Sequence, residues 1–424
     1  MKLKIRDRIK RLRRGADYEN FYTALDIGTE YIKALIIRRE GDNGIVLGVG
    51  RQQQSYADMV SGAVADIQAV IDNCNHALEQ AEDMAEAIPG RAVIGIAGEQ
   101  VKGFSTAVTV PRHDPGQRIN RVELQNTLEM VQKRAMREAT HLMGQELGVP
   151  EVSLKLIHST ITTVRIDGYL VTNPMDFQGK SMEITVFNTF APLTHIGALQ
   201  TIAAELDLEL IATVAEPFAM ARCCATDEVY EFGGIFVDVG GGTTDVALIR
   251  NGGIEGAKMF TIGGRVFTKK IAAHLNLSFV EAEELKVRYS RGKVSEDRVK
   301  QLRALLAPDA EVLVNGVALT LQQLAKADRL PSNIYLAGGG SALPEIEEYL
   351  NAYPWMEQLP FPRKPVVRAL APTDVRNIYD STGLLLSQQD ITPMGLGYQA
   401  IQEDEGEKDL LYSTMRRIMR AMKV

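Results

Sequence analysis

The stretch GGIFVDVGGGTTDVALIRNGG, residues 233–253, interrupts an apolar run with a glycine-rich turn that has an aspartate on each side. The run ends in Asp238, three consecutive glycines and two threonines follow, and Asp245 opens the next apolar run. Without side chains in the way, the backbone N–H groups of such a turn converge on an anion, typically a phosphate. A carboxylate beside a phosphate is repelled unless a cation lies between them, so Asp238 is a candidate ligand for Mg²⁺.

A second stretch repeats this pattern. ALDIGTEYIKALII, residues 24–37, has the same order of apolar run, aspartate, glycine and apolar run, with Asp26 in the place of Asp238. A third glycine turn lies in NIYLAGGGSALPEIEEYL, residues 333–350. A single turn of this kind is equally well explained as a tight hairpin whose aspartate caps the turn. Two matched turns about 210 residues apart instead predict two related halves of the chain, with the anion site between them.

The composition is that of an ordinary soluble protein with more than one core. At 424 residues the chain is too long for a single simple core, and 45% of its residues are hydrophobic and 24% are charged. The three cysteines, Cys74, Cys223 and Cys224, have no metal-site spacing and suit a reducing cytosol. No apolar run reaches about 18 residues, so no membrane span is expected.

The two ends are basic, although the net charge of the chain is −7. Residues 1–14 hold eight Lys or Arg and one acid, and their apolar side chains form one helical stripe. The sequence leaves open whether this stripe is a membrane anchor in addition to the C-terminal one. Nucleic-acid binding is not expected, because no aromatic platform accompanies this charge and the body of the chain is acidic.

The C-terminal end, residues 401–424, predicts an acidic linker followed by a basic amphipathic helix. Such a helix after an acidic linker is typical of an anchor that lies in the plane of an anionic membrane surface. The alternative is a terminal helix that docks on the acidic body. The residues expected to contact the membrane are Leu411, Met415, Arg416, Ile418, Met419, Arg420 and Met422.

Residues 90–168 read as a strand, a helix and a strand, an α+β module inserted into the first half. SMEITVFNTF, residues 181–190, is expected to resume that half. The predicted domains are a basic arm (1–20), a first lobe (21–89 and 169–222), the inserted module (90–168), a second lobe (223–400), and the linker and helix (401–424).

The three glycine turns resemble, in the expected order, the two phosphate motifs and the adenosine motif of the actin/DnaK-type ATPase superfamily. TVAEPFAMA, residues 213–221, resembles the helix that connects the lobes in that superfamily. VIGIAGEQVKGFSTAV (93–108) and EAEELKVRYS (281–290) are most similar to FtsA, a family of bacterial actin-like cell-division proteins. The resemblance covers about residues 23–400. It implies an α/β, actin-like, two-lobed ATPase fold with duplicated RNase H-like domains and an inserted α+β subdomain.

The resemblance also implies ATP or ADP with Mg²⁺ as cofactors. Asp26 and Asp238 would hold the metal, directly or through water. Glu216 matches the position that orients the attacking water in some relatives, although it is equally well explained as a helix-start glutamate before Pro217. The residues implied at the nucleotide are Asp26, Gly28, Thr29, Asp238, Gly240, Gly241, Gly242, Thr243, Thr244, Gly263, Gly264, Glu283, Lys286, Gly338, Gly339 and Gly340.

One segment departs from the FtsA pattern. FtsA proteins have a long helix before the adenosine strand, whereas residues 293–332 offer only two short helical pieces, SEDRVKQLRALLA and LTLQQLAKA. An accessory subdomain around residues 265–332 is therefore expected to be reduced. In the family this subdomain contacts FtsZ, the tubulin-like ring protein, so this partner is in question.

The resemblance implies an ATP-binding protein with weak ATPase activity that polymerises on the cytoplasmic face of the cell membrane. Its partners would be other copies of itself, an FtsZ-like tubulin homologue or other division proteins, and anionic lipid, with no nucleic acid. One alternative is a PilM-like nucleotide-binding scaffold of a type IV pilus or secretion machine. The other is a soluble ATPase or kinase of the same fold.

Overall fold

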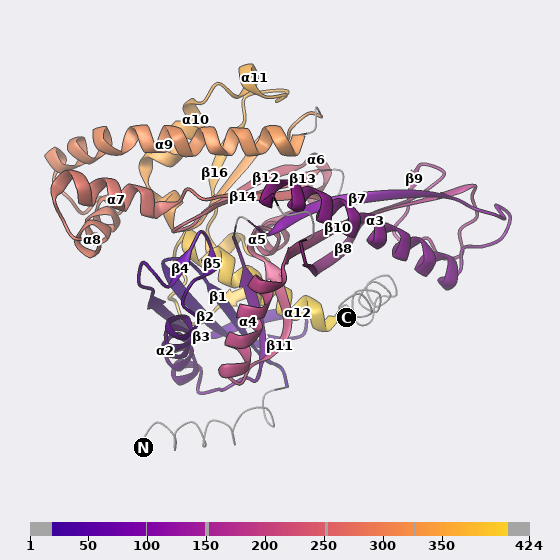
Figure 1. The fold of residues 1–424 in the computed structure, drawn as a ribbon, viewed down its shortest axis with the longest axis horizontal. Helices are drawn as coiled ribbons and strands as arrows, with labels where there is room; N and C mark the ends of the chain where they lie inside the picture. The colour runs from indigo at the N-terminus through magenta and orange to yellow at the C-terminus, as the bar shows by residue number, and fades with distance from the viewer. Residues whose placement is uncertain (1–18, 99, 149–151, 251–252, 326–327, 406–424) are drawn as a thin grey trace.

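The computed structural model describes residues 19–98, 100–148, 152–250, 253–325 and 328–405. These residues form two lobes that are each built around a β-sheet, and an arm extends sideways from them (Figure 1). The α/β, two-lobed expectation is therefore confirmed. The expected N-terminal arm and the membrane-binding residues from Leu411 to Met422 lie outside the described residues.

The first lobe contains a six-stranded sheet in the order β11-β6-β1-β2-β3-β17. Strands β1, β2 and β3 are antiparallel neighbours in it, whereas β11, β6 and β1 are parallel. Helix α2 packs closely on β3 at Gly50, which has no side chain. A Cβ atom on Gly50 would lie only 1.8 Å from the carbonyl oxygen of Ala77 in α2. The elements of this lobe are β1 (Phe21–Ile27), β2 (Tyr31–Glu40), β3 (Asn43–Gln53), β4 (Met59–Val60), β5 (Ala63–Val64), α2 (Ile67–Ala85), β6 (Arg91–Ile96), α4 (Leu193–Glu205), β11 (Glu209–Ala215), β17 (Ile378–Asp380) and α12 (Ile391–Glu405).

The second lobe supplies five strands of a nine-stranded sheet, in the order β16-β15-β12-β13-β14. Its helices α7 to α10 gather at the outer end of this lobe, and α5 and α6 precede β12 (Figure 1). The elements are α5 (Glu216–Cys224), α6 (Asp227–Phe232), β12 (Gly234–Val239), β13 (Thr244–Arg250), β14 (Gly253–Phe260), α7 (Gly264–Leu275), α8 (Phe279–Ser290), α9 (Glu296–Ala325), β15 (Asn333–Ala337), α10 (Pro344–Ala352), α11 (Trp355–Gln358) and β16 (Val366–Ala369).

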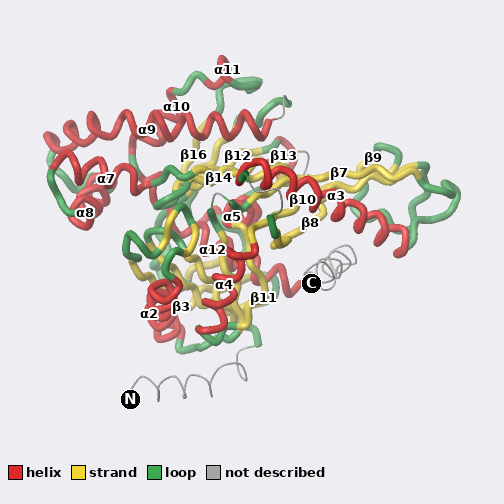
Figure 2. Tube along the Cα trace, viewed as in Figure 1, coloured by secondary structure: helices red, strands yellow, loops and turns green. Residues whose placement is uncertain are grey.

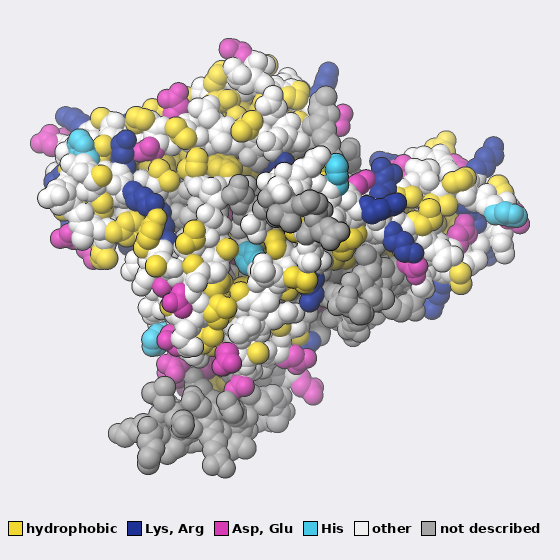
Figure 3. Space-filling view, in the orientation of Figure 1, with side chains coloured by type: hydrophobic (Ala, Val, Ile, Leu, Met, Phe, Trp, Pro, Cys, Tyr) yellow, Lys and Arg dark blue, Asp and Glu magenta, His cyan; other side chains and the backbone are white. Residues whose placement is uncertain are grey.

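The arm is a long antiparallel ribbon with one helix beside it (Figure 2). Its strands continue the second lobe's sheet, because β14 pairs with β7 through Gly256–Phe104 and Ala257–Gly103. On the face shown in Figure 3, Lys and Arg side chains gather over the arm. The elements are β7 (Lys102–Pro111), α3 (Arg121–Leu147), β8 (Leu154–Ile166), β9 (Tyr169–Leu170) and β10 (Ser181–Pro192).

Two strands, β6 and β10, do not join the part of the structure that the predicted bounds of the inserted module assign to them. Strand β6 was expected inside the module, but it pairs with β1 and β11 in the sheet of the first lobe. Strand β10 was expected to resume the first lobe, but it pairs with β7 and β8 in the arm. The alternating pattern of a strand fixes which faces it buries but not which sheet it joins, so these two expectations are wrong.

The expectation of short helical pieces in residues 293–332 is also wrong. Helix α9 runs without a break for 30 residues, with Pro308 inside it. A proline in a helix interior costs about 3 kcal/mol and favours a break. The apolar stripe nevertheless continues through Pro308 at steps of three and four residues, and its burial in the core of the second lobe outweighs that cost. The stripe consists of Leu302, Leu306, Ala310, Leu313, Val317, Leu321 and Leu324.

Helices α12 and α9 bear on the predicted acidic linker and on the expected absence of a membrane span. Helix α12 extends to Glu405, so the first residues of the expected acidic linker are helical instead. Within the described ranges, α9 is the one helix whose length and composition would allow it to cross a membrane. Its buried stripe accounts for that composition, because it packs in the core of the second lobe.

Candidate functional site

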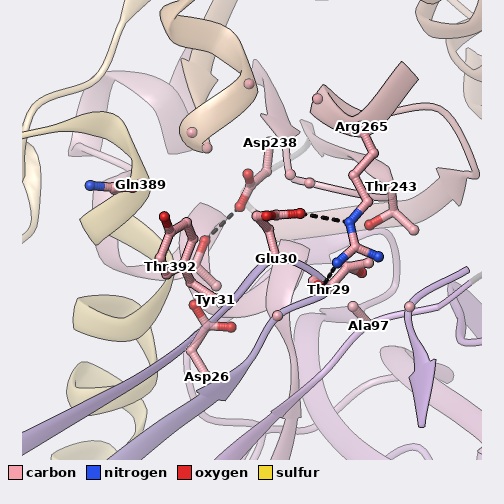
Figure 4. Close-up of a pocket in the computed structure, with 18 of the residues that line it drawn as sticks. Asp26, Thr29, Glu30, Tyr31, Ala97, Asp238, Thr243, Arg265, Gln389 and Thr392 are labelled. Atoms are coloured by element: carbon pink, nitrogen blue, oxygen red, sulfur yellow. Dashed lines mark hydrogen bonds and ion pairs between the residues drawn. The ribbon is translucent and has the colours of Figure 1, made fainter. Parts of the chain in front are cut away.

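A cavity between the two lobes brings the predicted phosphate turns together (Figure 4). The first turn joins β1 to β2, and the second joins β12 to β13. Residues near Gly338 close the cavity from a third side, where β15 ends. Of the predicted residues, the following line the cavity: Asp26, Gly28, Thr29, Glu216, Asp238, Gly240, Gly241, Thr243, Gly264, Glu283, Lys286, Gly338, Gly339 and Gly340.

The register of the two hairpins places a second ionisable residue opposite each aspartate. Lys33 on β2 pairs with Asp26 on β1, and its Nζ donates a hydrogen bond to Asp26 Oδ2 at 2.8 Å. Asp245 on β13 pairs with Asp238 on β12 in the same way. Cross-strand partners share one face of a sheet, so all four side chains point toward the same cleft. Sequence reasoning missed Lys33 and assigned no role to Asp245.

The charge of Asp26 keeps Lys33 protonated. Burial alone would lower the pKa of Lys33, but the adjacent carboxylate and its hydrogen bond outweigh burial and raise the pKa above its ordinary value. Lys33 is therefore a fixed positive charge at the base of the cavity. Asp26, in turn, is almost fully buried, with 3% of its surface exposed.

Asp238 is held by two features of the surrounding loops. Thr392 at the start of α12 donates a hydrogen bond from Oγ1 to Asp238 Oδ2 at 2.5 Å. On the other side the backbone of Gly338 approaches so closely that a Cβ atom there would lie 2.1 Å from Asp238 Oδ1. Gly338 also has a φ of +83°, which favours glycine. A glycine is thus required at this position by both space and backbone conformation.

The three other residues predicted near the second turn contact the protein around the turn and do not line the cavity. Thr244 does not reach the cavity, because its hydroxyl donates to the carbonyl oxygen of Ile262 at 2.7 Å. A Cβ atom on Gly263 would lie 2.8 Å from the carbonyl oxygens of Gly240 and Gly241, so only glycine fits there. Gly242 lies against the first turn, where a Cβ atom would lie 2.8 Å from the side chain of Thr29. These three residues shape the turn, and none of them lines the cavity.

Glu283 and Lys286 line the cavity as an ion pair on α8. Lys286 Nζ donates to Glu283 Oε2 at 2.7 Å, to Thr268 Oγ1 at 2.8 Å and to the carbonyl oxygen of Gly264 at 3.0 Å. Thr268 also donates to Glu283 Oε2, at 2.5 Å. The pair is therefore held rigidly beside the N-terminus of α7, at the wall formed by the second lobe.

Six of the carboxylates that line the cavity are buried, namely Asp26, Glu30, Glu216, Asp238, Asp245 and Glu283. Burial raises the pKa of Glu216 well above its ordinary value, and the charges of Asp26, Asp245 and Asp238 raise it further. Burial likewise raises the pKa of Asp238, and it raises that of Asp245 strongly. Glu216 Oε1 and Asp245 Oδ1 are buried and accept no hydrogen bond from any described residue. Such a site lacks positive charge, which a bound cation would supply.

These residues fit a magnesium ion that is held through water. Among the described residues no three carboxylates, histidines or cysteines are close enough to hold a metal directly. The orphaned oxygens of Glu216 and Asp245 and the buried carboxylate of Asp238 can instead accept hydrogen bonds from metal-bound water. Mg²⁺ commonly keeps several waters and takes few protein ligands, so the donor set suits it.

Replacing Glu216 with glutamine is expected to stabilise the Mg²⁺-free protein at high pH. A carboxyl whose pKa is raised by folding contributes stability at low pH, which is lost as the pH rises from the unfolded value of about 4.5 through the folded value. Glutamine stays neutral and avoids this loss. Urea unfolding with EDTA at pH 5 and pH 8 should therefore show the variant gaining about 1–3 kcal/mol over the unchanged chain at pH 8. An equal pH dependence in both proteins would contradict the raised pKa of Glu216.

Comparison with known proteins shows similarity to one family of cell division proteins. A family model described as "Cell division protein FtsA" matches residues 235–383. "Cell division protein FtsA" of Pseudomonas aeruginosa is 25% identical over 418 residues, which cover 91% of this chain and 94% of the relative. The Bacillus subtilis protein of the same description is 22% identical over 345 residues, covering 77% of this chain and 74% of the relative.

Two solved structures share the fold. The "PilM-PilN type IV pilus biogenesis complex" matches with a TM-score of 0.63 and 17% identity, covering 90% of this chain and 98% of that one. The "ethanolamine utilization protein EutJ" of Carboxydothermus hydrogenoformans matches with a TM-score of 0.50 and 17% identity, covering 89% of each chain. Both have the actin-like ATPase fold. The chain is therefore similar to FtsA cell division proteins over most of its length, and it has the actin-like ATPase fold.

Proposed function

We propose that the chain binds Mg²⁺-ATP and Mg²⁺-ADP in the cavity between its lobes. The convergence of two matched glycine turns on one cavity that also holds Lys33 supports this proposal most strongly. The backbone N–H groups of both turns would contact the phosphates, and Lys33 would neutralise part of their charge. Asp26 and Asp238 would hold the hydrated metal. Bound Mg²⁺ would supply charge neutralisation at the phosphates, which the carboxylate-rich wall cannot supply.

The wall of the second lobe would bind the remainder of the nucleotide. Glu283 and Lys286 would meet the ribose and base, and the glycines at residues 338–340 would lie against the adenosine, because bulkier residues there would fill the cavity. Gly340, for example, lies so near Val239 that a Cβ atom would be 2.6 Å from its Cγ1. The assignment of these glycines to the adenosine follows the family pattern, and their position on the cavity wall supports it.

Glu216 would position the attacking water, and hydrolysis would be slow. Helix α5 begins at Glu216, and this residue lines the cavity from the connection between the lobes. Burial raises the pKa of Glu216 and so favours its neutral form, whereas a bound cation would favour the ionised form that can accept a proton. A weak ATPase activity suits a protein in which the nucleotide controls lobe closure and assembly.

We also propose that the chain polymerises on the cytoplasmic face of the cell membrane and recruits division proteins. Similarity to FtsA proteins supports this role. The predicted amphipathic helix at Leu411 to Met422 would bind anionic lipid. The full-length helix α9 removes the reason for expecting a reduced accessory subdomain. An FtsZ-like tubulin homologue is therefore proposed as a partner, together with further copies of the chain.

Removing residues 410–424 is expected to weaken membrane binding strongly and to prevent the formation of filaments on lipid. The intact chain with Mg²⁺-ATP should sediment with vesicles that contain anionic lipid and should form filaments on a lipid monolayer in electron micrographs. The shortened chain should sediment much less, because the C-terminal apolar stripe and its four basic residues are gone. Equal sedimentation of both chains would refute the C-terminal anchor. A chain that binds lipid without forming filaments would refute polymerisation instead.

A PilM-like scaffold remains the second candidate, because the PilM-containing structure matches nearly the whole chain. This likeness concerns the fold alone, whereas the sequence relatives described above are FtsA proteins. The two candidates differ in the expected behaviour on lipid. A scaffold of this kind would not need to assemble into ATP-dependent filaments, so the monolayer experiment separates them.

A further inference from the structure

An ion pair between Glu30 and Arg265 joins the two lobes directly beside the phosphate turns. Arg265 lies in the first turn of α7, and its Nε donates to Glu30 Oε2 at 2.6 Å. The same guanidinium donates from Nη2 to the carbonyl oxygen of Thr29 at 2.7 Å and from Nη1 to that of Tyr56 at 3.3 Å. All three of these contacts run from the second lobe to the first.

Both charges are buried and satisfied in this closed arrangement. Glu30 is 9% exposed and Arg265 is 6% exposed. The second carboxylate oxygen of Glu30 accepts a hydrogen bond from Gln53 Nε2 at 3.0 Å. A buried ion pair with additional hydrogen bonds is stable as a pair, but either partner alone is costly in the same place.

The aromatic ring of Tyr56 packs over the ion pair. The ring of Tyr56, on the first lobe, faces the guanidinium of Arg265 at 5.2 Å and the ammonium of Lys269 at 4.8 Å. Phe279 of the second lobe meets the same ring edge-on, with the ring centroids 5.8 Å apart. These contacts also cross between the lobes, and Tyr56 is about half exposed at 52%, so its ring lies at the protein surface.

The ion pair also fixes the two phosphate turns against each other. Glu30 belongs to the first turn, and a Cβ atom on Gly241 of the second turn would lie 2.8 Å from its Cβ. The backbone N–H of Arg265 donates to the carbonyl oxygen of Gly241 at 2.7 Å. In Figure 4 the side chain of Glu30 reaches from the first turn toward Arg265. The turns cannot separate at this edge unless the Glu30–Arg265 pair breaks.

We infer that Glu30, Tyr56, Arg265 and Lys269 form an interlobe latch that holds the cleft closed and sets the rate at which nucleotide leaves. The effect on nucleotide rests on the proposed function, whereas the closure itself is a property of the chain alone. When the cleft is open, water solvates both charges, so losing one partner costs little there. When it is closed, the remaining partner is buried without its counter-charge, so the loss falls on the closed state.

Interlobe distances measured without nucleotide test the latch by itself. Spin labels on cysteines introduced at Gln68 of α2 and Glu284 of α8 report on opposite lobes, and both positions are exposed, whereas the three native cysteines are buried. With Glu30 and Arg265 unchanged, the labelled protein should give one short, narrow distribution of distances between the two labels. Glu30→Gln and Arg265→Gln should each shift it to longer, broader distances, and the double variant should resemble either single variant, because both changes break the same pair.

Nucleotide exchange tests the second half of the inference. In stopped-flow chase experiments with a fluorescent ATP analogue and Mg²⁺, Glu30→Gln should release nucleotide at least about tenfold faster, equivalent to about 1.4 kcal/mol. The matched control is Glu255→Gln, which breaks the ion pair of Glu255 with Arg250 (2.6 Å) inside the second lobe. This control should leave both the distance distribution and the release rate unchanged.

The outcomes separate this inference from the proposed function. Unchanged distances in folded Glu30→Gln and Arg265→Gln proteins, with fold checked by circular dichroism, would overturn the latch even if nucleotide binds. Should one variant fail to fold, the other decides. An unchanged chain that binds no Mg²⁺-ATP would overturn the proposed function, and the distance measurements would still decide whether the latch exists.

Discussion

Replacing Asp238 with alanine is expected to weaken binding of Mg²⁺-ATP by about 10–100-fold, because losing one group that supports a bound metal typically costs that much in affinity. Asp238 is one of the two aspartates proposed to hold the hydrated metal, and the neighbouring carboxylates cannot move into its place, since each is buried on its own strand or helix. Isothermal titration calorimetry with Mg²⁺-ATP measures the loss directly. With ATP in EDTA, the unchanged chain and the variant should differ much less.

Two further variants show whether the charge or the side-chain volume is responsible. Asp238→Asn keeps an acceptor for the hydroxyl of Thr392 and removes only the charge, so it should lose most of the Mg²⁺-dependent affinity. Asp72→Ala removes an exposed carboxylate from α2 and should bind as the unchanged chain does. An Asp238→Ala protein with undiminished affinity would show that the metal site lies elsewhere.

Replacing Gly338 with alanine is expected both to destabilise the second lobe and to abolish nucleotide binding. The added Cβ atom would lie 2.1 Å from Asp238 Oδ1 and 2.4 Å from the carbonyl oxygen of Val239, neither of which can move freely. The φ of +83° adds backbone strain for any residue with a Cβ atom. We expect a loss of about 2–5 kcal/mol in the free energy of unfolding, measured by urea unfolding without nucleotide.

The neighbouring residue provides the control for this change. A Cβ atom on Gly339 would approach nothing closer than 3.6 Å, where it meets the side chain of Gln389. Gly339→Ala should therefore unfold within about 1 kcal/mol of the unchanged chain. If Gly338→Ala were as stable as Gly339→Ala, then the tight approach of the Gly338 loop to Asp238 would be wrong.

The parts of the site that lie within a single hairpin were predictable from the sequence. The matched runs around Asp26 and Asp238 predict two similar hairpins, and the cavity between them follows from their duplication. Lys33 and Asp245 could have been found by the same reasoning. A tight turn fixes the register, and this register places each of them opposite an aspartate.

Contacts between distant segments could not be predicted in this way. Glu30 and Arg265 are separated by 235 residues, and no local pattern marks them as partners. The hydroxyl of Thr392 reaches Asp238 only because α12 crosses behind the second turn. Such contacts depend on how the lobes pack, which a periodic pattern does not specify.

The prediction of short helical pieces in place of α9 was wrong for a different reason. Here the sequence does contain the pattern that indicates one long helix. Pro308 suggests a break, yet the apolar residues on either side of it, from Leu302 to Leu324, keep a helical period without a change of phase. When a buried stripe continues in phase across a proline, the burial of that stripe outweighs the local preference.

The arm has two different attachments at its base. Its chain enters from β6 and leaves toward α4, both in the first lobe, whereas its β7 strand is hydrogen-bonded to β14 of the second lobe. Helix α3 has 27 residues, so the arm extends about 40 Å from this base. A rotation of about 10° at the base therefore moves the tip by about 7 Å, in the way that small shifts are amplified along rigid elements. Because the arm is attached to both lobes, a change in the opening angle of the cleft would displace its tip by more than the movement at the cleft itself.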